Sequence, residues 1–276
     1  APFQLWSRAV TPSVLSKLDL YGQYAIAAYC DDNIASAGTE VTCSAGNCPL
    51  VQAATTNTLS EFNESNEFGD VAGFFAVDTT NQALVLSFRG SHTIDNWIAN
   101  LDFGLTSVST LCSGCKAHTG FWKAWNTVAS DIAAAVDAAQ DTYPSYPIIF
   151  TGHSYGAALA ALAATTMRNA GYSIELYTYG QPRIGNTALA TYITNQNKGG
   201  NYRVTHTNDI VPRLVPRLLG YSHFSPEYWI TSGNNVTVTA SDITLVTGID
   251  SNGGNAGELL QSVEPHYWYF VEVEDC

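Results

Sequence analysis

A serine in the middle of the chain stands in a setting that could make it a nucleophile. Ser154 lies within Gly152-His153-Ser154-Tyr155-Gly156, after the apolar run 147–151 and before the alanine-rich stretch 157–169. This pattern predicts a strand, a tight turn and a helix, which together expose a serine above a sheet and back it with a helix N-terminus. The alternative is a glycine-rich turn with an inert serine, but the flanking strand and helix favour the nucleophile.

A serine nucleophile needs a histidine to take its proton and an acid to orient that histidine. Asp209 follows a predicted strand, so it should lie at the carboxyl end of the sheet, where α/β proteins gather their catalytic side chains. His266 lies in a predicted loop well downstream of that acid. We therefore expect a triad of Ser154, Asp209 and His266. Peripheral or structural positions are expected for the other candidates, which are Asp242, Asp250, His118, His153, His206 and His223.

Acyl transfer also needs two hydrogen-bond donors aimed at the oxyanion that develops during the reaction. One donor is expected from the backbone N–H of Tyr155, directly after the serine. The other is expected from Ser91, because residues 88–91 end an earlier strand with a glycine that permits close approach. The alternative is that residues 89–91 form an ordinary turn.

The segment after Ser91 carries a single apolar stripe. Ile94, Trp97, Ile98 and Leu101 recur at helical spacing and share one face. Such a stripe either faces the core of the protein or belongs to a lid that covers an active site in water and turns outward to meet lipid. We expect the lid.

The six cysteines suggest a disulfide framework. Cys43 and Cys48 are close in sequence, as are Cys112 and Cys115, so local bridges are the simplest solution and leave Cys30 to pair with Cys276. A redox or zinc motif at 112–115 is the alternative, but no second motif of that kind accompanies it. Disulfides imply a secreted, extracellular protein.

Strand and helix patterns alternate through the chain, which predicts an α/β fold with a mostly parallel central sheet and helices on both faces. We expect one domain over residues 1–276, and residues 1–8 fit either a retained pro-segment or an ordinary N-terminus. Residues 31–60 are expected to be loop-like. Helices are predicted at 11–29, 120–139 and 186–195, and strands at 71–77, 84–89, 174–179, 202–207, 227–231 and 236–239.

Composition limits the partners. A net charge of -13 repels nucleic acid and anionic membranes, so a neutral substrate is favoured. No stretch of the sequence has the length and apolarity of a membrane span. Asn63 and Asn235 begin N-glycosylation sequons.

Seven short motifs are spread along the chain. They are Ala27 to Cys30, Phe88 to Ser91, His118 to Phe121, Gly152 to Gly156, Tyr179 to Asn186, Asp209 to Arg213 and Pro226 to Trp229. In these motifs the chain resembles the secreted fungal class 3 lipases, the group of the Thermomyces and Rhizomucor lipases, and more distantly the type A feruloyl esterases. The resemblance implies the α/β-hydrolase fold and the triad, oxyanion and disulfide residues named above. The sequence departs from the family at Tyr155, where leucine is usual.

These features predict a secreted, monomeric serine carboxylester hydrolase that needs no cofactor and no metal. The apolar stripe favours a triacylglycerol lipase with interfacial activation, whose substrate is a triglyceride or other neutral ester at a lipid–water interface. A soluble, feruloyl-type esterase and a phospholipase are the alternatives within enzymes. An inactive lipid-binding protein is the alternative outside them, and the intact triad argues against it.

Overall fold

A mixed sheet organises the computed structural model, which describes residues 7–35, 37–66, 69–274 and 276. Within these residues, nine strands pair in the order β1-β13-β12-β10-β8-β7-β4-β3-β2. The central strands are parallel, namely β4 (Ala83–Phe88), β7 (Ile148–His153), β8 (Ile174–Tyr179), β10 (Asn201–His206) and β12 (Glu227–Ile230). Antiparallel strands flank them, with β2 (Thr56–Asn66) and β3 (Gly69–Asp78) at one edge and β13 (Ile243–Val246) and β1 (Ser7–Arg8) at the other. The predicted fold class is confirmed.

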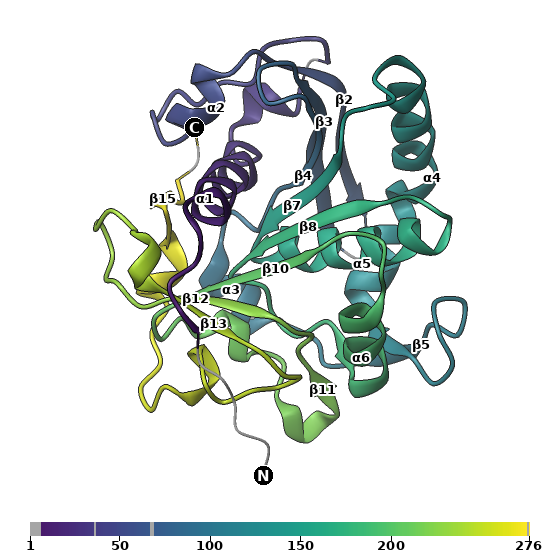
Figure 1. The fold of residues 1–276 in the computed structure, drawn as a ribbon. Helices are drawn as coiled ribbons and strands as arrows, with labels where there is room; N and C mark the ends of the chain where they lie inside the picture. The colour runs from purple at the N-terminus through teal and green to yellow at the C-terminus, as the bar shows by residue number, and fades with distance from the viewer. Residues whose placement is uncertain (1–6, 36, 67–68, 275) are drawn as a thin grey trace.

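Helices cover both faces of this sheet (Figure 1). α1 (Pro12–Ala27) packs on one face together with α2 (Pro49–Ala53), and α4 (Thr119–Thr142) and α5 (Tyr155–Asn169) pack on the other. Residues 157–164 are six alanines and two leucines and are fully buried, and the small alanines let α5 approach the strands closely. α6 (Thr187–Asn195) packs against the short strands β6 (Lys116–His118), β9 (Gly185–Asn186) and β11 (Tyr221–Ser222).

Smaller elements surround the ends of the central strands. β5 (Leu105–Ser107), β6 (Lys116–His118), β9 (Gly185–Asn186) and β11 (Tyr221–Ser222) form a second sheet, and β14 (Trp268–Tyr269) pairs with β15 (Val271–Glu272). α3 (Ile94–Ala99) is a short helix. The 3₁₀ turns are Asp31–Asn33, Val211–Arg213, Arg217–Leu219, Ala240–Asp242, Asn255–Gly257 and Glu264–Tyr267.

Two predictions about secondary structure are wrong. Residues 236–239 form no strand, and the strand comes later, at β13. Residues 31–60 are not all loop, because they contain α2 and the start of β2. The apolar pattern did not reveal β2 because this strand lies at the edge of the sheet and exposes polar side chains along much of its length.

The predicted pro-segment falls partly outside the described residues, which begin at residue 7. Residues 7 and 8 form β1, which pairs with Leu245 and Thr244 of β13. The pro-segment and the single-domain organisation stay predictions.

The three predicted disulfides are present. Cys30 bonds to Cys276 across a separation of 246 residues and so joins the end of α1 to the end of the chain. The local bridges are Cys43–Cys48 and Cys112–Cys115. The sulfur atoms of Cys30, Cys43 and Cys276 lie within 4.8 Å of one another, but each is bonded in a disulfide and so offers no thiolate to a metal.

Candidate active site

Ser154 sits at the tight turn between β7 and α5. Its backbone angles, φ 57° and ψ −124°, belong to a region that non-glycine residues rarely adopt, as a nucleophile elbow requires. A Cβ on Gly152 would come within 2.4 Å of the Gly156 carbonyl oxygen, and a Cβ on Gly156 within 2.2 Å of the Phe88 carbonyl oxygen. Both positions therefore have to be glycine, which explains the pattern seen in the sequence.

The predicted acid and histidine lie in contact. His266 Nδ1 donates to Asp209 Oδ2 at 2.8 Å, and Asp209 Oδ1 accepts from the Val211 N–H at 2.9 Å. Both side chains are fully buried. Because Nδ1 holds the hydrogen toward Asp209, Nε2 keeps a lone pair that can accept a proton. Neither Nε2 nor Ser154 Oγ has a hydrogen-bond partner among the described residues, so no hydrogen bond links serine and histidine in this structure.

His153, next to the serine, connects the elbow to the loop that carries His266. Its Nε2 donates to the His266 carbonyl oxygen at 2.9 Å, which leaves Nδ1 to accept from the Tyr29 hydroxyl at 2.8 Å. Burial, and then the nearby His266, lower the pKa of His153 well below its usual value. The ring is therefore neutral and has the structural position that was predicted for it.

Tyr269 is a member of the site that sequence reasoning missed. Its hydroxyl donates to Asp209 Oδ2 at 2.6 Å, beside the His266 nitrogen, and its side chain is fully buried. Burial, and then the charge of Asp209, raise the pKa of Tyr269 well above its usual value, so the phenol stays a neutral donor. The available signal was its spacing, three residues after His266 across a short turn.

Asn255 is a second residue that the sequence analysis did not identify, and it supports the backbone of the Asp209 loop. Asn255 Nδ2 donates to the carbonyl oxygens of Asp209 at 2.8 Å and of Thr207 at 3.1 Å. The buried Glu227 carboxylate accepts in turn from the Asn255 N–H at 3.1 Å and from Thr205 Oγ1 at 2.5 Å. These contacts fix the backbone on which the acid stands.

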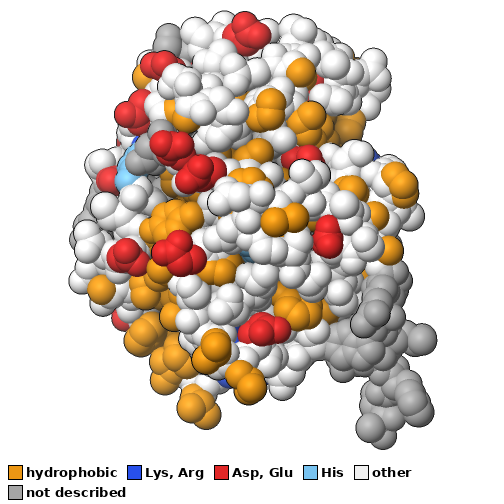
Figure 2. All heavy atoms as spheres, turned by 90° about the vertical axis from the view of Figure 1, so that its left-hand side faces the viewer, with side chains coloured by type: hydrophobic (Ala, Val, Ile, Leu, Met, Phe, Trp, Pro, Cys, Tyr) orange, Lys and Arg blue, Asp and Glu red, His pale blue; other side chains and the backbone are white. Residues whose placement is uncertain are grey.

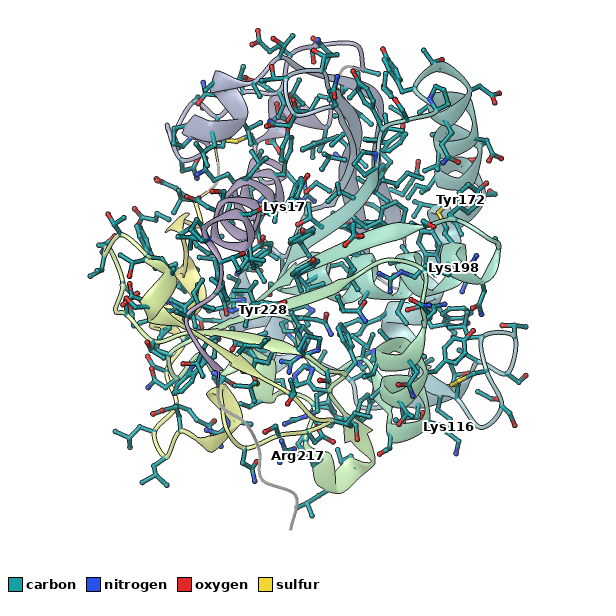
Figure 3. The ribbon with its side chains drawn as sticks, in the orientation of Figure 1. Lys17, Lys116, Tyr172, Lys198, Arg217 and Tyr228 are labelled. Atoms are coloured by element: carbon teal, nitrogen blue, oxygen red, sulfur yellow. A yellow bond between two sulfur atoms is a disulfide. The ribbon has the colours of Figure 1, made fainter. Side chains whose placement is uncertain are left out.

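The other candidate acids lie in structural contacts. Asp250 pairs with Arg183 at 3.6 Å and with Arg217 at 3.4 Å, at the lower edge of the molecule where Figure 3 labels Arg217. Asp242 closes a capping box with Thr239.

The remaining histidines also serve the framework. His118 Nε2 donates to the Asp102 carbonyl oxygen at 2.6 Å, and His118 caps α4. His206 lies between the carbonyl oxygens of Pro265 and Ser232. His223 Nε2 donates to the Pro212 carbonyl oxygen at 2.6 Å.

The predicted oxyanion residues meet at one cavity. Ser91 and Tyr155 both line a space of about 220 Å³, together with Gly90, His92 and Trp97. A Cβ on Gly90 would come within 1.9 Å of the Tyr29 hydroxyl and within 2.8 Å of the His153 carbonyl oxygen. Only glycine therefore lets the end of β4 lie so close to the elbow.

Comparison with known proteins identifies the family. A protein-family model described as lipase (class 3) matches residues 85–219, and a family model for the lipase 3 N-terminal region matches residues 2–61. A secreted mono- and diacylglycerol lipase A of Penicillium cyclopium is 47% identical over 99% of this chain and 90% of its own length. The chain belongs to the class 3 lipases.

Other relatives of this lipase agree. A secreted mono- and diacylglycerol lipase 1 of Fusarium solani is 40% identical, with 97% of this chain and 79% of that protein covered. The crystal structure of a mono- and diacylglycerol lipase from Aspergillus oryzae superposes with a TM-score of 0.89 at 42% identity, covering 96% of this chain and 98% of that one. The predictions of the family, of a carboxylic ester hydrolase and of a secreted protein are confirmed. Within the described residues, no helix has both the length and the apolarity to cross a bilayer.

The predicted apolar stripe of this lipase faces inward. Ile94 is buried and Trp97 and Ile98 are half-buried, whereas the intervening polar residues of α3 are exposed. The Trp97 ring is stacked on the Phe121 ring, with 6.2 Å between the ring centroids, and lies tilted against the Tyr155 ring, with 6.5 Å between the centroids. Leu101 follows the helix and lines a cavity of about 370 Å³ with these three aromatic residues. α3 therefore covers a cavity next to the elbow that has apolar and polar walls.

Both predicted glycosylation residues lie on the surface. Asn63 is exposed on the edge strand β2, and Asn235 is exposed in a turn. Each is accessible for modification, which stays a prediction.

Proposed function

We propose that this protein is a secreted, monomeric lipase that hydrolyses glyceride esters through Ser154, His266 and Asp209. The observation that carries the proposal is the buried His266–Asp209 hydrogen bond of 2.8 Å, made in the loops that flank the strained turn bearing Ser154. That bond leaves His266 Nε2 free to act as a general base.

The proposed reaction is acyl transfer in two halves. Ser154 Oγ attacks the ester carbonyl carbon while its proton passes to His266 Nε2. The N–H groups of Tyr155 and Ser91 stabilise the oxyanion. The C–O bond then breaks, and the alcohol leaves with the proton from His266. Water, deprotonated by the same nitrogen, attacks the acyl-enzyme, releases the fatty acid and restores Ser154, while Asp209 balances the imidazolium charge throughout.

A lipid surface is the partner that we propose. The most exposed leucines are Leu218, Leu259 and Leu260, at 99%, 96% and 78% exposure, and they lie on the loops that follow Asp209 and precede His266. Figure 2 shows hydrophobic side chains gathering along one lower edge of the molecule, and acidic side chains scattered over that face among other polar and hydrophobic ones. This arrangement suits contact with an uncharged lipid surface better than with an anionic one.

We propose that α3 is the lid. Its apolar side chains cover the cavity in water, and a lipid surface would offer them an alternative partner and so favour the open state. The named activity of the relatives is on mono- and diacylglycerols, so the proposed substrates are glycerides as a class, triglycerides included.

A substrate panel tests the proposal. The enzyme should hydrolyse emulsified triolein and a diacylglycerol, and should act far less well on soluble methyl ferulate. Ser154→Ala, Asp209→Ala and His266→Ala should each lower turnover by several orders of magnitude, as in other acyl-transfer triads. The control is Asp242→Ala, which removes an exposed cap away from the elbow. A preference for methyl ferulate over both glycerides would instead support the soluble esterase.

A further inference from the structure

The hydroxyl group of Tyr155 is buried and has no hydrogen-bond partner among the described residues. Tyr155 is 6% exposed, and among the described residues its hydroxyl is the one buried tyrosine oxygen without a hydrogen bond. Tyr24 donates to Asp78 at 2.7 Å, and Tyr179 donates to the Leu18 carbonyl oxygen at 2.6 Å. Buried hydroxyl groups are rarely left unpaired, and the exceptions call for an explanation.

The Tyr155 side chain lies beside the serine that reacts in the proposed mechanism. Tyr155 directly follows Ser154, and its ring lies between two cavities. The larger cavity has apolar walls from Trp97, Leu101 and Phe121. The smaller one is lined largely by polar residues. Trp97 borders both cavities, so displacement of α3 would open them together.

The smaller cavity offers both hydrogen-bonding roles. Asp70 lines it and supplies a carboxylate that can accept, one oxygen of which also accepts from Ser65 Oγ at 2.7 Å. Burial, and then the charge of Asp70, raise the pKa of Tyr155, so its phenol keeps its hydrogen and can donate. A hydroxyl group of a ligand can take both roles, accepting from the Tyr155 phenol and donating to the Asp70 carboxylate. Arg89 lines the same cavity, so the opposite charges of Asp70 and Arg89 leave it without a net charge, which suits an uncharged ligand group.

We propose that Tyr155 is a specificity-determining residue, and that its hydroxyl binds a free hydroxyl group of the substrate close to the scissile ester. The inference rests on the proposed function. Two parts of a substrate can supply such a group, namely the glycerol of a partial glyceride and a hydroxylated acyl chain. Leucine, the usual residue of the family at this position, has no polar atom for either of them. The phenol thus makes this enzyme discriminate where a leucine enzyme does not.

The test compares kcat/KM for three esters of one acyl length, with wild type and Tyr155→Phe. Methyl decanoate lacks a free hydroxyl, monodecanoylglycerol carries it on the alcohol, and methyl β-hydroxydecanoate carries it on the acyl chain. Wild type should prefer a hydroxyl-bearing ester over methyl decanoate by about fivefold, the value of one neutral hydrogen bond, and Tyr155→Phe should abolish that preference. The ratio within each variant is the readout, because the Tyr155 backbone belongs to the proposed oxyanion site.

The control is Tyr172→Phe, which removes a paired hydroxyl beside α4, before the start of β8, where Figure 3 labels the residue. Its ratios should equal those of wild type. Loss of the preference on one ester alone identifies the alcohol or the acyl chain as the source. Unchanged ratios for Tyr155→Phe on both hydroxyl-bearing esters would overturn the inference. No hydrolysis of any of the three esters by wild type would instead count against the proposed function.

Discussion

Removal of the Tyr269 hydroxyl tests whether the second donor to Asp209 serves catalysis. Tyr269→Phe deletes one of three hydrogen bonds on that carboxylate, and His266 at 2.8 Å and the Val211 N–H at 2.9 Å remain. The bond is 2.6 Å long, fully buried and made to a carboxylate. Its loss should lower the free energy of unfolding by about 1.5 to 3 kcal/mol. We expect kcat to fall about tenfold, equivalent to about 1.4 kcal/mol, because a less firmly held carboxylate orients His266 less well.

Urea unfolding and kcat on a dissolved p-nitrophenyl ester measure the two effects. Tyr179→Phe is the matched control, since its hydroxyl is equally buried and donates over the same 2.6 Å, but to the neutral Leu18 carbonyl. It should lose about 0.5 to 1.5 kcal/mol of stability and keep its kcat. If both variants lose kcat equally, the effect comes from a loosened core and the role given to Tyr269 is wrong.

Three further predictions concern pH, the long disulfide and the lid. Burial lowers the pKa of His223, so below about pH 6.5 only the unfolded chain takes up a proton at this residue. As the pH is lowered further, the unfolding free energy should therefore decrease, by up to about 1.4 kcal/mol for each pH unit. Urea titrations at several pH values should show a smaller decrease for His223→Gln. Replacing Cys30 and Cys276 by serine should cost about 3 to 5 kcal/mol, measured by urea unfolding, and an unchanged midpoint would contradict this. Ile98→Asp should weaken activity on emulsified triglyceride far more than on dissolved p-nitrophenyl acetate, and equal losses would leave α3 a structural helix.

The sequence predicts the buried elements well and the edge of the sheet poorly. Strands such as β4 and β7 are buried on both faces and appear as continuous apolar runs, so their positions follow directly from the sequence. β2 has no such run, because an edge strand exposes many of its residues to water. The error at residues 236–239 is the opposite one, because their β-branched side chains predict a strand that does not form. These residues lie largely exposed before a 3₁₀ turn.

In the site, the local sequence pattern predicts the residues whose backbone conformation is unusual or closely packed. Glycines with no room for a Cβ mark the elbow, and chain order points to Asp209 and His266. Tyr269 and Asn255 escape such rules because their roles depend on contacts between distant loops. The spacing of Tyr269 after His266 places it near the site, but neither residue type by itself reveals the carboxylate or carbonyl that it will contact.

Covalent labelling of the serine tests the central claim most directly. The enzyme is treated with a p-nitrophenyl phosphonate, and peptide mass mapping locates the label. We expect one phosphonyl group per chain on Ser154, with labelling abolished in Ser154→Ala and strongly slowed in His266→Ala, because the attacking oxygen must give up its proton to that histidine. Stoichiometric label on another residue, or full hydrolytic activity in Ser154→Ala, would contradict the proposed mechanism.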